Sequence, residues 1–181
     1  IGGTRQYWNI LPSDYIVKKN MKITLLNLPG EPNPDNSLNF IYMNGDACEL
    51  SHLNENAYDI VHSNSVIEHV GDWERMKKFA KEAVRLAKFH YVQTPYFWFP
   101  IEPHAMTPIF HWLPKPVRVS LVMKFTLGHW GRQSSVSQAV STVESARLLD
   151  IKMFRALFPK SVIKNEKLFF IPKSLIAITR N

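Results

Sequence analysis

Four short apolar runs, each ending on polar or turn-forming residues, constrain the fold of this chain most strongly. They cover residues 22–26, 39–43, 58–62 and 89–92, and their composition is typical of β-strands. Between the third and fourth runs, apolar residues recur at helical spacing after Asp72, which predicts a helix capped by that residue. Strands that alternate with helices predict a doubly wound, mostly parallel α/β sheet.

The second half of the chain is predicted to close this sheet. Residues 161–170 and 174–179 are expected to be strands, separated by Pro172-Lys173, and so short a connection predicts an antiparallel hairpin. Asp150 is expected to cap a helix that ends near Phe158. The intervening residues 94–135 are rich in proline, aromatic residues and histidine, and they are expected to form an insert with a loop over 128–138. We expect one domain over residues 1–181.

Composition narrows the function classes. The formal net charge is +7, but the basic residues are dispersed, so a basic surface is favoured over a nucleic-acid footprint. Cys48 is the single cysteine, which excludes an internal disulfide and a cysteine-rich zinc site. This composition suits a reducing cytoplasm, which is the predicted location. No apolar run reaches the roughly 20 residues of a membrane span.

Ligands of doubly wound sheets bind outside the carboxyl ends of the strands. The residues to examine are therefore those that follow the apolar runs. They are Gly2-Gly3, Asn27, Asp46, Ser63 to Ser65, and Gln93 to Pro95.

The same strand ends carry a family resemblance. Residues 58–70, which read YDIVHSNSVIEHV, resemble the fourth-strand signature of class I S-adenosylmethionine-dependent methyltransferases. Gly45-Asp46-Ala47 resembles the third-strand signature of that family at the expected distance upstream, and Gly2-Gly3 stands where its glycine-rich first loop belongs. The C-terminal hairpin also matches the last two strands of the fold, so the resemblance covers the chain apart from the insert. It implies a Rossmann-like sheet and S-adenosylmethionine as cofactor.

The resemblance implies a role for each strand end. The glycines would let the backbone approach the cofactor, Asn27 would contact the ribose, and Asp46 with the Ala47 amide would bind adenine. Ser63, Asn64 and Ser65 would lie beside the methyl donor, with helix or turn capping as the alternative. Cys48 and Leu50 would wall the adenine, with ordinary packing as the alternative for Cys48.

Two features depart from the family pattern. Gly2-Gly3-Thr4-Arg5 does not continue the usual Gly-x-Gly-x-Gly, and Asn27 replaces the usual carboxylate. The first, central strand of the fold is also missing before Ile1, which would leave two neighbouring strands with open edges. We therefore expect roughly ten or more further residues upstream in the natural chain, forming an apolar strand that ends in Asp or Glu.

The insert is the expected acceptor site, because it leaves the sheet at the ligand-binding edge. Candidate acceptor-binding residues are Tyr96, Trp98, Glu102, His104 and Trp112. His69 and His104 are candidate general bases, with a structural role as the alternative for His69. No tight ligand set accompanies His104 and His111, so no metal site is predicted. A lid or a homodimer surface is the alternative for the insert.

The favoured function is therefore methyl transfer from S-adenosylmethionine to a small molecule that the sequence does not identify. The alternative is a peripheral membrane protein, or one that binds a lipid-linked acceptor, because residues 98–125 combine aromatic and basic side chains. A nicotinamide-dependent dehydrogenase is disfavoured, because Gly-x-Gly-x-x-Gly is not satisfied after Gly2.

Overall fold

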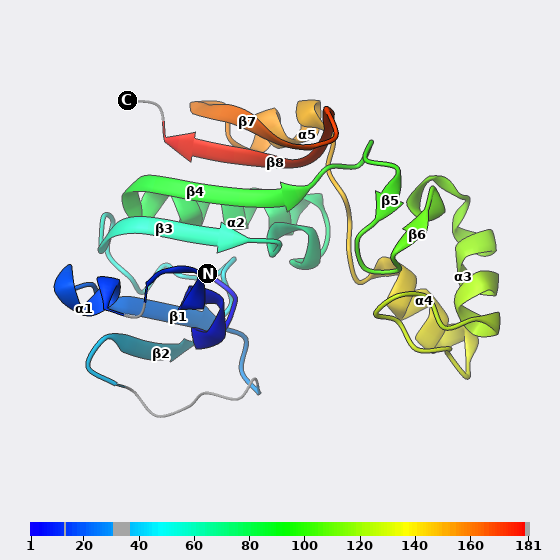
Figure 1. Cartoon of the computed structure of the whole chain (residues 1–181), viewed down its shortest axis with the longest axis horizontal. Coiled ribbons are helices and arrows are strands. Elements are labelled where there is room, and N and C mark those ends of the chain that lie inside the picture. The colour runs from blue at the N-terminus through cyan, green and yellow to red at the C-terminus, as the bar shows by residue number, and fades with distance from the viewer. Residues whose placement is uncertain (13, 31–36, 180–181) are drawn as a thin grey trace.

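The computed structural model describes residues 1–12, 14–30 and 37–179, and it has the predicted parallel strands. β1 (Ile23–Asn27) pairs in parallel with β2 (Phe40–Asn44), and β3 (Tyr58–Asn64) pairs in parallel with β4 (Ala87–Pro95). Their carboxyl ends all point toward the insert, on the right in Figure 1. The four apolar runs of the sequence are thus strands.

The C-terminal hairpin completes the larger sheet. β7 (Ser161–Leu168) and β8 (Ile171–Thr179) are antiparallel, and β8 also pairs antiparallel with β4. The four-stranded sheet therefore has the order β3-β4-β8-β7. This arrangement confirms the predicted mostly parallel sheet with an antiparallel C-terminal hairpin.

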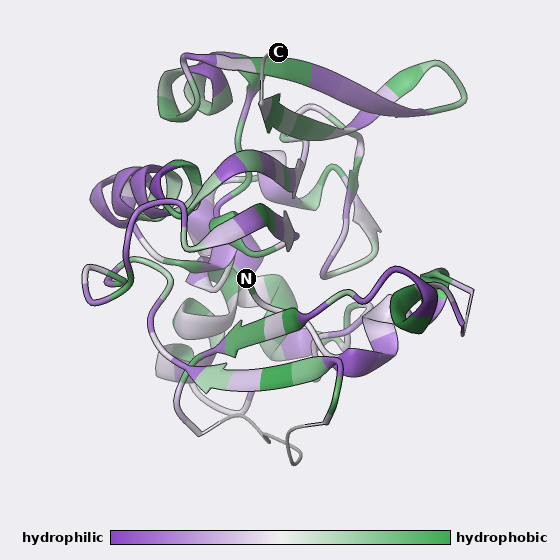
Figure 2. Ribbon diagram, turned by 90° about the vertical axis from the view of Figure 1, so that its left-hand side faces the viewer, coloured by the Kyte–Doolittle hydropathy of each residue, from purple (hydrophilic) through white to green (hydrophobic). Residues whose placement is uncertain are grey.

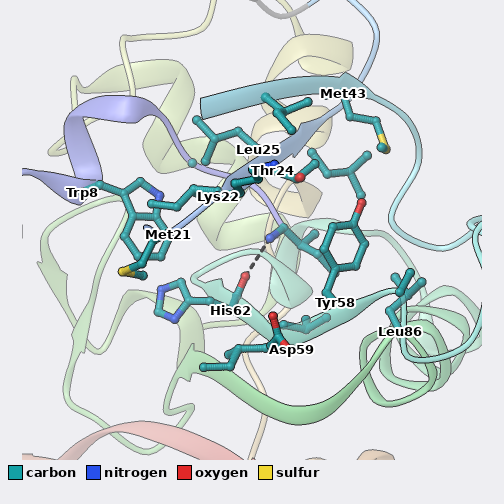
Figure 3. Close-up of a pocket in the computed structure, with 18 of the residues that line it drawn as sticks. Trp8, Met21, Lys22, Thr24, Leu25, Met43, Tyr58, Asp59, His62 and Leu86 are labelled. Atoms are coloured by element: carbon teal, nitrogen blue, oxygen red, sulfur yellow. Dashed lines mark hydrogen bonds between the residues drawn. The ribbon is translucent and has the colours of Figure 1, made fainter. Parts of the chain in front are cut away.

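A gap separates this sheet from the β1-β2 pair. In the part of the chain that the structure describes, no strand lies between β1 and β3, as predicted. The two halves are joined where the Ile1 nitrogen donates to the His62 carbonyl (2.6 Å) and the Gly2 amide donates to the Leu26 carbonyl (2.8 Å). A cavity of about 870 Å³ runs along the gap, with Thr24 and Leu25 on one side and His62 on the other (Figure 3).

Two capped helices cover one face of the larger sheet. α2 (Trp73–Arg85) begins after Asp72, whose carboxylate accepts the Arg75 amide at 3.0 Å. α5 (Ile151–Leu157) begins after Asp150, which accepts the Met153 amide at 2.8 Å. Both predicted caps are therefore confirmed. The main core lies between these helices and the strands, and its fully buried side chains include Phe79, Ile67, Val92, Phe154 and Leu175.

A smaller core lies at the N-terminal part of the chain. η1 (Arg5–Ile10) and α1 (Tyr15–Lys18) precede β1. Ile16 of α1 packs with Ile23 and Leu25 of β1, whereas Leu26 belongs to the main core. The side chains of neighbouring residues in β1 thus lie on opposite faces of the sheet, as the two-residue periodicity of a strand requires.

The insert folds around a core of its own. It contains β5 (Ile101–Glu102), β6 (Thr107–Pro108), η3 (Phe110–Trp112), α3 (Lys115–Lys124) and α4 (Val136–Glu144). Its buried residues are Ala105, Phe110, Val122, Ala139 and Val143. The expectation of a loop over 128–138 was wrong at its end, because the Ser135 hydroxyl accepts the Gln138 amide at 3.2 Å and starts α4. The packed unit therefore extends past residue 135. Within the described residues, no helix has the length and apolar run needed to cross a membrane.

The turn of the C-terminal hairpin differs from the expectation. Pro172 and Lys173 lie inside β8, and the turn is formed by Phe169 and Phe170, with φ angles of 46° and 72°. Pairing of Leu168 with Ile171 fixes this two-residue turn. The two phenylalanines are 85% and 94% exposed, and Figure 2 shows the apolar tip projecting from the molecule.

The positive φ angles in this turn predict that substitutions there can stabilise the protein. A two-residue turn with positive φ at both positions favours Asn-Gly, whereas the left-handed region costs other residues roughly 1–2 kcal/mol each. The variant with Phe169→Asn and Phe170→Gly is expected to raise the free energy of unfolding by about 1–2 kcal/mol, measured by urea denaturation. Phe125→Asn is the matched control, because Phe125 is 54% exposed and has an ordinary φ of −127°. An unchanged hairpin variant would contradict the prediction.

Candidate active site

The Gly2-Gly3 turn lies where the two halves of the sheet meet. Both glycines have positive φ, 71° and 86°, which disfavours any residue with a side chain. A Cβ on Gly2 would lie 2.5 Å from Cγ2 of Val66, whereas nothing lies within 4 Å of the Cβ position of Gly3. The backbone at Gly3 therefore borders open space, which is what close approach of a ligand to the backbone requires.

Asn27, at the end of β1, holds this turn in place. Its side-chain amide donates to the Gly3 carbonyl at 3.0 Å. The donor of Asn27 is thus used within the protein, and its side-chain oxygen is the group suited to accept a bond from a hydroxyl. The expectation that Asn27 contacts a ribose rests on that oxygen.

Asp46, after β2, is held by two donors. Oδ1 accepts the Cys48 amide at 2.9 Å, and Oδ2 pairs with the Arg75 guanidinium at 2.6 Å. Burial raises the pKa of Asp46, but the bonds from Arg75 and Cys48 outweigh this effect and hold the pKa below its usual value. The side chain is 29% exposed, and each carboxylate oxygen can accept a further hydrogen bond. Ala47, Cys48 and Leu50 are buried in the main core, which for Cys48 and Leu50 favours packing over a ligand wall.

Ser63, Asn64 and Ser65, at the end of β3, are not equivalent. Ser63 is fully buried, so its side chain cannot reach a ligand at this edge. Asn64 is exposed and its amide approaches the Tyr7 hydroxyl at 3.4 Å. The amide and hydroxyl of Ser65 both donate to Oε1 of Gln93 at 3.0 Å. Gln93 and Tyr7 thus support this strand end. Gln93 was among the strand-end residues identified in the sequence, whereas no sequence feature indicated a role for Tyr7.

The two candidate bases meet across the site. His69 follows β3 in η2 (Ile67–His69), His104 belongs to the insert, and their Nε2 atoms are 3.1 Å apart. Nδ1 of His69 lies 2.7 Å from the Ser145 carbonyl, and Nδ1 of His104 lies 2.7 Å from Oε1 of Glu102. Burial lowers the pKa of His69; burial acts in the same direction on His104, but the Glu102 carboxylate prevails and raises the pKa of that residue.

Glu68 lies beside the histidine pair and is 1% exposed. Its Oε2 accepts the Thr94 hydroxyl at 3.0 Å, whereas Oε1 is buried and has no hydrogen-bond partner among the described residues. Burial raises the pKa of Glu68 to about 7, although the Thr94 bond acts in the opposite direction. This carboxylate is thus a poorly compensated group in the interior.

The expected acceptor-binding residues separate into two groups. Trp98 and Trp112 are 56% and 40% exposed, with ring centroids 6.0 Å apart, and they form an aromatic surface. Glu102 is buried and binds His104 and the Ala105 amide, so it positions His104 and does not face solvent. Tyr96 packs against the main core.

A second cavity, of about 330 Å³, lies within the insert. Phe97, His111, Arg118 and Trp130 are among its lining residues. Nδ1 of His111 and Nε of Arg118 are buried and without a hydrogen-bond partner in the described parts of the chain. The cavity is thus lined by both polar and aromatic residues, a composition suited to a small molecule, although these two nitrogen atoms are themselves covered.

A family comparison covers the N-terminal half of the domain. The sequence model of the family described as "Methyltransferase domain" matches residues 16–89. Over these residues the chain is similar to the methyltransferase domain family. The match to this methyltransferase domain family spans β1 to β3 and α2, which carry Asn27, Asp46 and residues 63–69. No curated protein sequence matches the chain.

Solved structures share the fold of this chain. A SAM-dependent methyltransferase of Methanosarcina mazei is 13% identical with a TM-score of 0.52, over 98% of this chain and 97% of that one. One from Mesorhizobium loti is 10% identical with a TM-score of 0.51, over 88% and 80%. A protein of Rhodobacter sphaeroides described as a Zn-dependent alcohol dehydrogenase is 12% identical with a TM-score of 0.55, over 91% and 78%. Such low identities show the fold alone.

Proposed function

We propose that this methyltransferase domain binds S-adenosylmethionine across the strand ends and transfers its methyl group to a small molecule held against the insert. The observation that carries the proposal is the open space at Gly3, with Asn27 and Asp46 at the neighbouring strand ends. A Cβ at Gly3 would enter the space in which the amino-acid part of the cofactor would lie. The residues present therefore fit this cofactor.

Each strand end has a separate task in this proposal. The side-chain oxygen of Asn27 accepts a ribose hydroxyl, and the Asp46 carboxylate accepts the adenine amino group. Arg75 holds the Asp46 carboxylate ionised and oriented. Asn64, the exposed last residue of β3, lies on the other side of the gap from Asn27 and completes the binding edge.

The bound cofactor supplies a methyl group on a positively charged sulfur, which is a good leaving group. The protein then has to position the acceptor nucleophile and exclude water. The exposed Trp98 and Trp112 and the cavity lined by His111 and Arg118 are the surfaces of the insert that suit this role. The acceptor itself is not assigned.

The contact between His69 and His104 limits the general-base role that was expected of each residue. Both Nδ1 atoms face groups that accept hydrogen bonds, so the Nε2 atoms are the basic positions, and they face each other at 3.1 Å. A proton shared between them would leave neither lone pair free for the acceptor. A general-base role for either residue therefore requires the pair to separate.

Ligand-induced stabilisation tests the proposal. S-adenosylhomocysteine at about 100 times its dissociation constant is expected to add about 2.7 kcal/mol to stability and to raise the melting temperature, and NADH is expected to have no effect. His69→Ala and His104→Ala are expected to keep this shift. A wild-type protein that responds to NADH, or to neither ligand, would refute the proposed cofactor.

Asp46→Ala is expected to weaken binding of S-adenosylhomocysteine about tenfold or more, because it removes a charged hydrogen-bond acceptor. The substitution also breaks the ion pair with Arg75, so Arg75→Met is the matched control. The control breaks the same ion pair but keeps the carboxylate, and it is expected to bind more tightly than Asp46→Ala. Isothermal titration calorimetry measures both constants, and equal losses would assign the effect to the ion pair alone.

A further inference from the structure

Three side chains of metal-ligating type converge between η2 and the insert. They are Glu68, His69 and His104, whose ligand atoms all lie within 4.8 Å of one another. The two histidines are 35 residues apart in the chain, and the fold of the insert brings them into contact. Their spacing in the sequence therefore does not indicate a metal site.

The hydrogen bonds of the two histidines orient them as metal ligands. The Ser145 carbonyl can only accept a hydrogen bond, so Nδ1 of His69 carries the proton. The Glu102 carboxylate likewise accepts from Nδ1 of His104. Metal-ligating histidines are commonly fixed in this way, with one nitrogen donating to a carbonyl or carboxylate and the other facing the metal. With both Nδ1 atoms protonated, the two Nε2 lone pairs face each other across 3.1 Å, and a positive ion between them, either a proton or a metal, would relieve their repulsion.

Glu68 provides an independent indication. Its Oε1 is buried and has no partner among the described residues, although the side chain is 1% exposed. A buried carboxylate oxygen without a donor or cation is costly. A positive ion beside the histidine pair would supply the missing partner.

We propose that Glu68, His69 and His104 bind a divalent transition-metal ion through one carboxylate oxygen and the two Nε2 atoms. Zn²⁺ suits a site of two imidazoles and one carboxylate. Zinc–nitrogen bonds of about 2.0–2.1 Å at near-tetrahedral angles place two nitrogens roughly 3.0–3.4 Å apart. The 3.1 Å separation of the Nε2 atoms lies in this range, and the carboxylate has to move closer.

Three protein ligands leave one position of a tetrahedral ion open. Because His104 belongs to the insert, the ion would lie between the strand ends and the insert that is proposed to hold the acceptor. An acceptor oxygen bound there would be held in place and would lose its proton more readily. The ion would thus promote loss of the acceptor's proton, which the paired histidines cannot do as general bases. This metal site does not depend on the identity of the cofactor.

Metal titration of the untagged, chelator-treated protein tests this site. Zn²⁺ is expected to bind with one-to-one stoichiometry and to raise the melting temperature. Co²⁺ is expected to give the visible absorption of a low-symmetry site with nitrogen and oxygen ligands. Glu68→Gln, His69→Ala and His104→Ala are each expected to weaken Zn²⁺ binding at least about tenfold. The matched control is His129→Ala, because His129 is an exposed histidine of the same insert and should leave the affinity unchanged.

Two outcomes would overturn the proposal. One is the absence of stoichiometric Zn²⁺ and Co²⁺ binding by the folded wild-type protein, which would leave a shared proton as the cation between the histidines. The other is unchanged affinity in all three ligand variants. Circular dichroism and the shift with S-adenosylhomocysteine show whether each variant is folded, and His69→Gln replaces His69→Ala if that variant is not. Loss of metal binding with a retained cofactor shift separates this site from the proposed methyl-donor site.

Discussion

Phe110→Ala is expected to unfold the insert while the rest of the domain stays folded. Phe110 is 1% exposed in a core of only five buried residues, and it packs edge-on against Trp130. Removing a buried phenylalanine costs about 3–5 kcal/mol, which a core this small cannot absorb. The main core shares none of these residues and should persist.

Hydrogen exchange measures this effect segment by segment. The amides of α3 and α4 are expected to lose protection in Phe110→Ala, while those of α2 and β4 keep it. The shift with S-adenosylhomocysteine should remain, and Zn²⁺ binding should be lost together with the placement of His104. Phe125→Ala is the matched control, because Phe125 lies in the same insert but is 54% exposed. Equal loss of protection in α2 and α3 would show that the insert and the sheet unfold as one unit.

Gly128→Ala is expected to displace His104 by a different route. Gly128 has a φ of 53°, and a Cβ there would lie 2.5 Å from the carbonyl carbon of Ala105. The obstacle is backbone, so it cannot be relieved by a change of rotamer. The left-handed conformation and the overlap together are expected to cost about 3 kcal/mol. The amide of His129 would then lose its bond to the His104 carbonyl.

The nearby Gly131 provides the control for this substitution. Nothing lies within 4 Å of its Cβ position, so Gly131→Ala should change the stability by less than about 0.5 kcal/mol. Urea denaturation and Zn²⁺ titration of the two variants measure stability and the placement of His104 separately. A Gly128→Ala variant as stable as Gly131→Ala would show that the loop has room to move away from Ala105.

The parts of the fold that depend on local patterns were predictable. Apolar periodicity located β1 to β4 and α2, and Asp72 and Asp150 marked helix starts through a side chain that bonds three residues ahead. The hairpin turn was not predictable in this way. Phe169 and Phe170 have no turn preference, and only the pairing of the strands on either side places them there.

The positions of the candidate residues at the strand ends were predictable from the sequence, but the contacts between their side chains were not. Residues at the strand ends were identified because parallel strands share an edge, yet that reasoning could not show that Ser63 points inward. The pairing of Asp46 with Arg75 and of His69 with His104 joins residues 29 and 35 positions apart. Such contacts depend on how α2 and the insert pack against the sheet, which sequence spacing does not specify.

The contact between His69 and His104 couples the insert to the sheet. His69 follows β3 and His104 belongs to the insert, and their Nε2 atoms are 3.1 Å apart. An ion bound between the two rings would hold the insert against the strand ends. Thermodynamic linkage then requires that whatever seats the insert in this position also strengthens ion binding by the same factor. The affinity for the ion would thus report the position of the insert.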